Sequence, residues 1–353
     1  MPSQLAIEAI DLLSEMIAIQ SFSREEKAVA DFLEHYIELK GYKSLRKDNN
    51  IWLLSPGFDS SRPTILLNSH IDTVKPVSGW IRNPFVPVIE DGKLYGLGSN
   101  DAGASVVSLL HAFFYLTQQT QPFNLIFAAT AEEEVSGKNG IESLISELPK
   151  IDFAIVGEPT GMHLAVAEKG LMVLDCTAKG KAGHAARDEG ENAIYKALND
   201  IGWFQNYHFE KTSNLLGEVK MTVTQINAGT QHNVVPDKCS FVVDVRSNEM
   251  YTNEEILTEI QKQVSSEVVA RSTRLGSTAT PLNHPIVKRG IELNRKIYGS
   301  PTLSDQALID FASVKVGPGE SARSHTADEY IEIKEIEEAI QIYIDLLNQI
   351  SLE

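Results

Sequence analysis

The 353-residue sequence contains only two cysteines, Cys176 and Cys239, and far fewer cationic than anionic side chains. Two cysteines are too few for a disulfide framework or for a zinc site made of thiolates, so nitrogen and oxygen atoms must bind any metal ion. The 31 Lys and Arg against 48 Asp and Glu give a net charge of −17. This balance argues against a nucleic acid partner, which would be held mainly through phosphate charges.

Long apolar runs are also absent. No run approaches the roughly 18 residues that a membrane span requires, and the apolar segment 125–129 is far too short. Acidic side chains interrupt the apolar positions of the first 20 residues, which lack a basic start and a cleavage signal. We therefore predict a surface helix there, no membrane attachment and a cytoplasmic location.

The sequence does contain short apolar runs that alternate with helical stretches. Helical spacing of apolar residues marks two segments before residue 41. Beyond them, the pattern predicts strands over 64–68, 124–130 and 153–157, and helices over about 102–119 and 140–147. This alternation predicts an α/β fold with a mostly parallel sheet and helices on both faces.

The order of elements changes after about residue 168. A strand over 170–178 is followed by a helix, two strands, a second helix and a last strand over 268–274. This β-α-β-β-α-β order is the ferredoxin-like pattern. We predict a catalytic domain formed by residues 1–168 and 279–353, with a small ferredoxin-like α+β domain, residues 169–278, inserted into it.

Polar side chains that suit metal ions follow five predicted strands, at the strand ends where α/β sheets bind ligands. Gathered in space, so many carboxylates would repel one another without cations. Zinc accepts imidazole and carboxylate ligands, and one carboxylate can bridge two ions. Asp72 lies two residues after the first histidine on an extended segment and can hold its free ring N–H. The candidate ligands are His70, Asp101, Glu134, Glu158 and His325.

Each of these residues has a plainer interpretation when taken alone. A single His-x-Asp is commonly a surface or capping pair, and three consecutive glutamates are common at a solvated helix start. The occurrence of all these residues in this order, each after a successive predicted strand, favours a metal site. Competing motifs are incomplete or absent: Gly96-x-Gly98 lacks the third glycine of a dinucleotide fingerprint, and no serine-hydrolase elbow, His-Glu-x-x-His or phosphate loop occurs.

Together these segments resemble the di-zinc aminoacylase and exopeptidase family that includes acetylornithine deacetylase, succinyl-diaminopimelate desuccinylase and carboxypeptidase G. The resemblance implies a catalytic domain with an inserted dimerisation domain, and two zinc ions per subunit with cobalt as a substitute. The matching segments follow the family's order through nearly the whole chain: residues 69–74, 96–103, 131–140, 156–160, 180–194, 233–246 and 317–325.

The resemblance also implies roles for single residues. Glu133 matches the general base, which takes a proton from the attacking water and passes it to the leaving amine. In the same resemblance, Asp101 matches the ligand that bridges the two ions. His70 and Glu158 match the other ligands of one ion, and Glu134 and His325 match those of the second ion.

Three further matches lie in the inserted domain. His184 resembles a family histidine that reaches the partner subunit's active site and stabilises the oxyanion, so a homodimer is expected. The alternative for His184 is a solvent-exposed histidine of a hairpin. Asn233 matches the family's Asn-x-x-Pro segment, and Arg246 either binds a substrate carboxylate or pairs with Asp244.

The motifs look most like the acetylornithine deacetylase branch, particularly residues 157–160 and 183–186. The expected reaction is zinc-dependent hydrolysis of an N-acyl amino acid in arginine biosynthesis. N-acetyl-L-ornithine, N-acetylcitrulline and N-succinylornithine are the expected substrates. A succinyl-diaminopimelate desuccinylase or a metallo-dipeptidase would use the same chemistry. A metal-binding scaffold is the non-enzymatic alternative, which Glu133 disfavours because a scaffold needs no general base.

Overall fold

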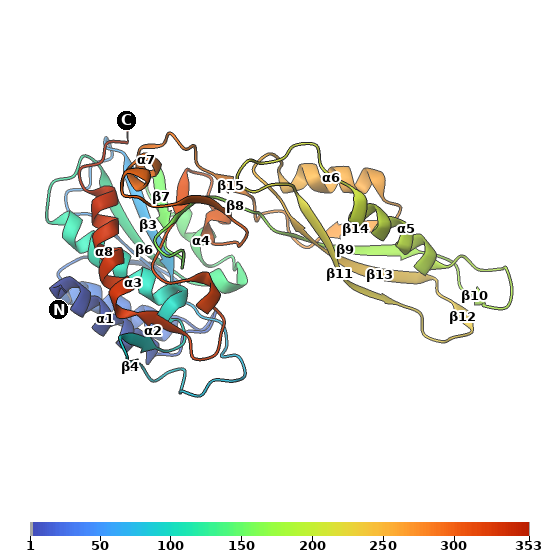
Figure 1. Cartoon of the computed structure of the whole chain (residues 1–353), viewed down its shortest axis with the longest axis horizontal. Coiled ribbons are helices and arrows are strands. Elements are labelled where there is room, and N and C mark those ends of the chain that lie inside the picture. Colours follow the sequence, from blue (N-terminus) through green and yellow to red (C-terminus); the bar gives the residue numbers. More distant parts are fainter. Residues whose placement is uncertain (1–2, 353) are drawn as a thin grey trace. The chain divides into compact units, whose positions relative to one another are not determined.

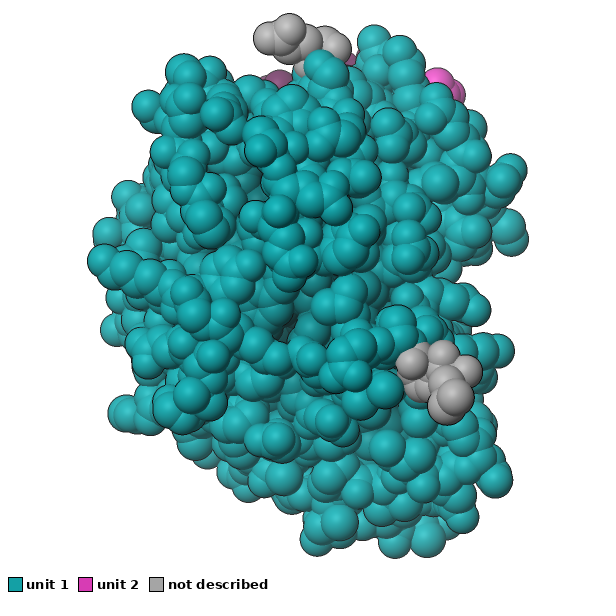
Figure 2. Space-filling model, turned by 90° about the vertical axis from the view of Figure 1, so that its left-hand side faces the viewer, with its two compact units in different colours: residues 1–166, 280–298, 304–353 teal, residues 167–279, 299–303 magenta. Residues whose placement is uncertain are grey.

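The computed structural model describes residues 3–352, and the chain divides into two compact units. Unit 1 comprises Met1–Val166, Thr280–Tyr298 and Ser304–Glu353, and unit 2 comprises Ala167–Ala279 and Gly299–Leu303 (Figure 2, teal and magenta). The segment predicted as an insertion, 169–278, lies within unit 2. The short segment 299–303 belongs to unit 2 as well, which the sequence pattern did not predict.

The central sheet has the strand order β1-β2-β6-β3-β7-β17-β8, and its strands β3, β6, β7 and β8 are labelled in Figure 1. Its four middle strands run parallel. All four are buried along their whole length, as strands covered on both faces are. The predicted α/β fold with a mostly parallel sheet is therefore confirmed. The parallel strands are β6 (Asn124–Thr130), β3 (Thr64–His70), β7 (Phe153–Val156) and β17 (Ser313–Lys315).

The flanking strands run antiparallel, which the sequence pattern did not predict. On one side, β1 (Leu45–Lys47) and β2 (Asn50–Leu54) form a hairpin, and β2 pairs with β6. The two-residue connection between them can only join antiparallel strands, and Asp48 there adopts a φ of 54°. On the other side β8 (Leu164–Glu168) pairs antiparallel with β17, and two short strands, β15 (Thr278–Ala279) and β16 (Ile297–Ser300), pair with β8.

Helices cover both faces of this sheet. On one face α3 (Ala104–Thr117) contacts β3 and β6, and it also contacts α1 (Gln4–Ile17) and α8 (Ile333–Leu347), which are labelled near it in Figure 1. Two more helices, α2 (Lys27–Leu39) and α7 (Pro285–Glu292), contact α1 and α8 respectively. On the other face α4 (Ile141–Ile145) packs on strand residues that include Leu66 and Ile126. Among residues 3–352, no helix combines the length and the apolar composition of a membrane span.

A small three-stranded sheet completes unit 1. It consists of β4 (Val88–Glu90), β5 (Lys93–Tyr95) and β18 (Tyr330–Glu332), with β5 in the middle. The strand β18 directly follows the segment that carries His325. This sheet therefore anchors one end of that segment.

Unit 2 contains a four-stranded antiparallel sheet in the order β11-β13-β9-β14. Every second residue of β9 is buried, because one face of the sheet packs on α5 and α6 around Leu174, Phe241 and Ile256. The predicted order of elements is present, with an added two-stranded ladder of β10 (Gly183–His184) and β12 (Val234–Val235). The main elements are β9 (Met172–Lys179), α5 (Ala193–Asn206), β11 (Lys220–Ala228), β13 (Lys238–Arg246), α6 (Asn253–Gln263) and β14 (Glu267–Ala270).

We predict that acidic pH lowers the free energy of unfolding of unit 1, because α3 contains a buried histidine. The ring Nδ1 of His111 lies 2.7 Å from the Val107 carbonyl oxygen, and Nε2 lies 3.1 Å from the Tyr36 hydroxyl. Burial lowers the pKa of His111 from 6.5 to about 4. Between these two pH values the His111 ring binds a proton in the unfolded chain but not in the folded chain. Stability is therefore complete above pH 6.5 and falls as the pH drops towards 4, by about 2 kcal/mol at pH 5.

The check is the free energy of unfolding in urea at pH 7.5 and pH 5. We expect His111→Gln to lose about 2 kcal/mol less than the unsubstituted chain between these two pH values. The matched control is His35→Gln, because His35 is exposed on α2. If all three proteins lose the same free energy, His111 is not the source of the acid sensitivity.

Candidate metal centre

The carboxyl ends of the parallel strands meet at one edge of the central sheet, and all the candidate ligands and the base except Asp101 lie at or after these ends. The strand before Asp101, β5, belongs to the small antiparallel sheet, whereas the sequence pattern placed it among the strands of the parallel sheet. His70 ends β3, Asp101 lies in extended conformation at a kink within the segment Ser99–Gly103 before α3, Glu133 and Glu134 open the turn Glu133–Val135 after β6, Glu158 follows β7, and His325 follows the turn Ser321–Arg323.

A first cluster of donor atoms surrounds His70. Its Nε2 lies 3.3 Å from Asp101 Oδ1 and 3.7 Å from Glu158 Oε1. One ligand atom of each of these residues lies within 4.8 Å of the other two. Glu158 Oε1 is buried and has no hydrogen-bond partner. An unpaired buried carboxylate oxygen is costly unless a cation binds it, so this cluster fits a metal ion.

A second cluster shares Asp101 with the first. His325 Nε2 lies 3.0 Å from Glu134 Oε2 and 3.7 Å from Asp101 Oδ2, and the ligand atoms again lie within 4.8 Å of one another. Asp101 thus presents one carboxylate oxygen to each histidine, which is the arrangement that a bridging ligand requires. The His325 side chain is 51% exposed and that of His70 only 1%, so solvent reaches the second cluster more easily.

The crowded carboxylates disturb one another's ionisation. Burial raises the pKa values of Glu133 and Glu158 well above the usual range, and neighbouring carboxylate charges add to the effect. Burial would lower the pKa of His70, but the charge of Glu133 and the hydrogen bond with Asp101 raise it overall. The hydrogen bond with Glu134 raises the pKa of His325 to about 9. So many carboxyl groups at short range favour a bound cation, and the nitrogen and oxygen donors suit zinc and similar ions.

Asp72 organises the main chain that carries the glutamates. Its carboxylate accepts hydrogen bonds from the main-chain N–H of Glu133 at 3.0 Å, from that of Glu134 at 3.1 Å and from the Ser23 hydroxyl at 2.7 Å. Nδ1 of His70 lies 3.0 Å from the main-chain oxygen of Asp72 and 3.4 Å from its carboxylate. The carbonyl is the nearer acceptor for the ring N–H. The Asp72 carboxylate therefore lies beside the His70 ring, as the spacing predicts, and it also holds the turn Glu133–Val135, which the spacing did not predict.

The other three predicted residues lie in unit 2. His184 is exposed, and its Nδ1 accepts a hydrogen bond from the main-chain N–H of Ala186 at 3.1 Å. Asn233 directly precedes β12, where Val234 pairs with His184, and its carbonyl accepts the Ala185 N–H at 3.0 Å. Arg246 donates two hydrogen bonds, at 2.8 and 3.1 Å, to Asp244. Of its two proposed roles, the structure therefore shows the pair within unit 2. The catalytic roles of these residues stay predictions.

Two residues that support the cluster were not predicted from the sequence, Ser23 and Glu329. Ser23 donates to Asp72, and Glu329 accepts hydrogen bonds from the main chain around Asp101. Neither residue belongs to a sequence motif. The partner of Ser23 is a side chain that the fold brings near, and the partners of Glu329 are main-chain groups. The only available signal was that Glu329 follows His325 by four residues and precedes a short apolar segment.

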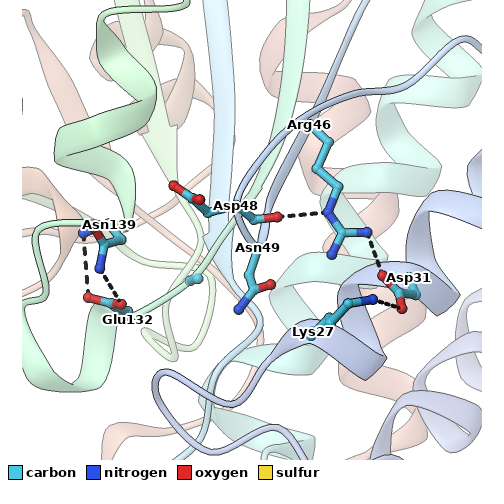
Figure 3. Close-up of a pocket in the computed structure, with 8 residues that line it drawn as sticks. Lys27, Asp31, Arg46, Asp48, Asn49, Glu132 and Asn139 are labelled. Carbon is cyan, nitrogen blue, oxygen red and sulfur yellow. Dashed lines mark hydrogen bonds and ion pairs between the residues drawn. The ribbon is translucent and has the colours of Figure 1, made fainter.

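A separate pocket of about 540 Å³ has Glu132, the residue before the turn Glu133–Val135, in its lining (Figure 3). Its charged groups are largely paired among themselves: Lys27 and Arg46 both pair with Asp31, and Asn139 donates to the Glu132 carboxylate. None of its lining residues is a candidate ligand or base. The pocket is lined by Lys27, Asp31, Arg46, Asp48, Asn49, Ala131, Glu132 and Asn139.

The fold and the paired donor clusters define a class of protein, the metal-dependent amide hydrolases. Within that class, the chain belongs to peptidase family M20/M25/M40, whose sequence model matches residues 66–349. The family predicted from the motifs is therefore confirmed, and so is the expectation of a metal-dependent amide hydrolase.

Curated relatives resemble the chain over most of its length. The succinyl-diaminopimelate desuccinylase of Sulfurovum sp. is 28% identical over 314 residues, which cover 83% of each chain. The LysW-lysine/LysW-ornithine hydrolase of Sulfurisphaera tokodaii is 28% identical over 357 residues, which cover 97% of this chain and 96% of the relative. These names do not single out the acetylornithine deacetylase branch.

Solved structures share the fold at lower sequence identity. Aminopeptidase PepT from Bacillus cereus superposes with a TM-score of 0.78 at 18% identity, covering 98% of both chains. A protein from Bacillus subtilis described as a dinuclear metal-binding peptidase of the M20 family has a TM-score of 0.73 at 16% identity, covering 97% of both chains. At these identities the likeness shows the fold alone.

Proposed function

We propose that this hydrolase cleaves the amide bond of an N-acyl amino acid, with two zinc ions and with Glu133 as general base. The observation that carries the proposal is the pair of donor clusters that share Asp101, with the Glu133 carboxylate 3.8 Å from His70 Nε2. When bound, the ions would polarise the amide carbonyl and lower the pKa of water. The first would be held by His70, Asp101 and Glu158, the second by Asp101, Glu134 and His325.

The chain's own residues account for the proton transfers. The Glu133 carboxylate takes a proton from water as the water oxygen bonds to the amide carbon. Glu133 then gives this proton to the nitrogen as the carbon–nitrogen bond breaks, which releases a carboxylic acid and an amine. Asp72 fixes the main chain of Glu133 through a 3.0 Å hydrogen bond, so the base is preorganised for both transfers.

For the substrate, we propose N-acetyl-L-ornithine or a close relative in arginine biosynthesis. Residues 157–160 and 183–186 support this branch. Two relatives named for diaminopimelate and ornithine derivatives support a diamino acid as the amine product. N-succinyl-diaminopimelate is the second candidate, because several relatives carry that name. A cytoplasmic homodimer is part of the proposal.

The substrate is tested by amine release from N-acetylornithine, N-acetylcitrulline, N-succinylornithine, N-succinyl-diaminopimelate and a dipeptide. We expect chelator-sensitive turnover, with the highest kcat/KM on N-acetylornithine. A higher kcat/KM on N-succinyl-diaminopimelate would replace the proposed substrate with the second candidate. A protein that binds two ions yet cleaves none of the five compounds would contradict the proposed function.

The proposed role of His184 predicts a loss of turnover and a rescue between subunits. Loss of one oxyanion donor costs ~10²–10³-fold in kcat, so we expect that loss for His184→Ala. If His184 acts in the partner's site, mixing His184→Ala with Glu133→Gln subunits will restore part of the turnover, because one site of each mixed dimer has both residues. Mixed dimers without any recovery would contradict this role in the partner's site.

A further inference from the structure

Glu329 is a buried carboxylate that neither metal cluster uses. Its residue is 2% exposed and directly precedes β18, four positions after His325. Oε1 accepts hydrogen bonds from the main-chain N–H of Asn100 at 2.9 Å and of Asp101 at 3.0 Å, and Oε2 accepts that of Gly98 at 3.0 Å. Three N–H groups thus converge on one carboxylate, which makes these charge-assisted hydrogen bonds strong. The segment that they hold carries the shared ligand Asp101.

Asn100 ties the same two segments together a second time. Its Nδ2 donates to the Glu320 carbonyl oxygen at 3.1 Å and to the Ser324 hydroxyl at 3.2 Å, and its Oδ1 accepts the Glu320 N–H at 3.1 Å. A Cβ on Gly319 would lie 2.2 Å from that oxygen, so only glycine permits this approach. Segment 98–101, which carries Asp101, is therefore hydrogen-bonded to both ends of segment 320–329, which carries His325.

The second cluster needs this support more than the first does. His325 lies in a loop between a helical turn and β18, at a φ of 58°, and its Nε2 lies 3.7 Å from Asp101 Oδ2. Metal ligands must keep their distances within about 0.2 Å, so a small shift of either segment would spoil a shared site. His70, in contrast, ends a central strand that is paired with β6 as far as Thr130.

We propose that Glu329 is a positioning residue for the second metal ion. Its carboxylate clamps the main chain at Asp101 against the segment that carries His325, and it touches neither substrate nor metal. The inference rests on the proposed two-metal function and deepens it. Loss of Glu329 therefore weakens the ion held by Asp101, Glu134 and His325 more than the ion held at His70.

The test is Glu329→Gln, which keeps the size of the side chain but turns an N–H₂ group towards main-chain N–H groups. Zinc binding to the metal-free protein is measured by calorimetry, and the visible spectrum is recorded after loading with Co²⁺. We expect the second ion to bind about 10–100-fold more weakly, as for other groups that orient metal ligands. We also expect an altered Co²⁺ spectrum and a lower kcat at similar KM. Glu329→Asp, too short to reach all three N–H groups, is the second variant and should weaken the same ion.

The matched control is Asp200→Asn in unit 2. Asp200 is also a buried carboxylate that accepts main-chain N–H groups, from Ser265 at 3.1 Å and Ser266 at 2.8 Å. Its loss should lower the unfolding temperature but leave both ions and the Co²⁺ spectrum unchanged. If both Glu329 variants behave like this control, or weaken the two ions equally, the positioning role is wrong. If the unsubstituted protein binds fewer than two ions, the two-metal function itself fails.

Discussion

Glu133→Gln is expected to lower kcat by about 10²–10⁴-fold, the usual contribution of a general base, without loss of metal. Glutamine keeps the volume of the side chain but cannot take a proton from water. The carboxylate of Glu133 belongs to neither donor cluster, so both ions should stay bound. The measurement combines kcat on the best substrate of the panel with the metal content of the purified variant.

Glu132→Gln provides a control one residue away. The Glu132 carboxylate accepts a hydrogen bond from Asn139 Nδ2 at 2.9 Å and lines the separate pocket (Figure 3). We expect this variant to keep most of its turnover. Unchanged kcat in Glu133→Gln would remove Glu133 from the mechanism, and a loss of bound metal in that variant would make it a ligand instead of a base.

Asp101→Ala is expected to cost about three orders of magnitude in kcat/KM and to weaken both ions. Asp101 supplies a donor oxygen to each cluster, so one substitution removes a ligand from both. Metal ions contribute several kcal/mol to transition-state stabilisation, and each 1.36 kcal/mol corresponds to a tenfold change in rate. The metal content after dialysis and the residual kcat/KM on the best substrate check this expectation.

Chelation of the unsubstituted protein should reproduce the same loss, and added Zn²⁺ or Co²⁺ should reverse it there but not in Asp101→Ala. The control is Asp305→Asn, a buried carboxylate that accepts hydrogen bonds from Asn68 and Thr130 at 2.8 Å and belongs to neither cluster. It should retain both ions. If Asp101→Ala keeps two tightly bound ions, the clusters do not share that ligand.

The sequence by itself predicted much of the catalytic unit because the decisive signals are local. The apolar runs 65–67 in β3 and 125–129 in β6 indicate strands covered on both faces, and their alternation with helices implies parallel neighbours. Parallel strands present their carboxyl ends at one edge. The polar residues that follow these strands could therefore be grouped from the sequence alone, and the structure brings them together with Asp101, which follows a strand of the small sheet.

Other features depended on the tertiary structure. The antiparallel direction of β1 and β2 follows from the tight turn at Asp48, and the pairing of Arg246 with Asp244 follows from the geometry of β13. The Asp72 and Glu329 carboxylates bind main-chain N–H groups, which every residue except proline carries. Residue identity and spacing cannot show which N–H group a carboxylate will meet. Only the folded path of the two loops decides that, so the sequence determined the candidate ligands and the tertiary structure determined what holds them in place.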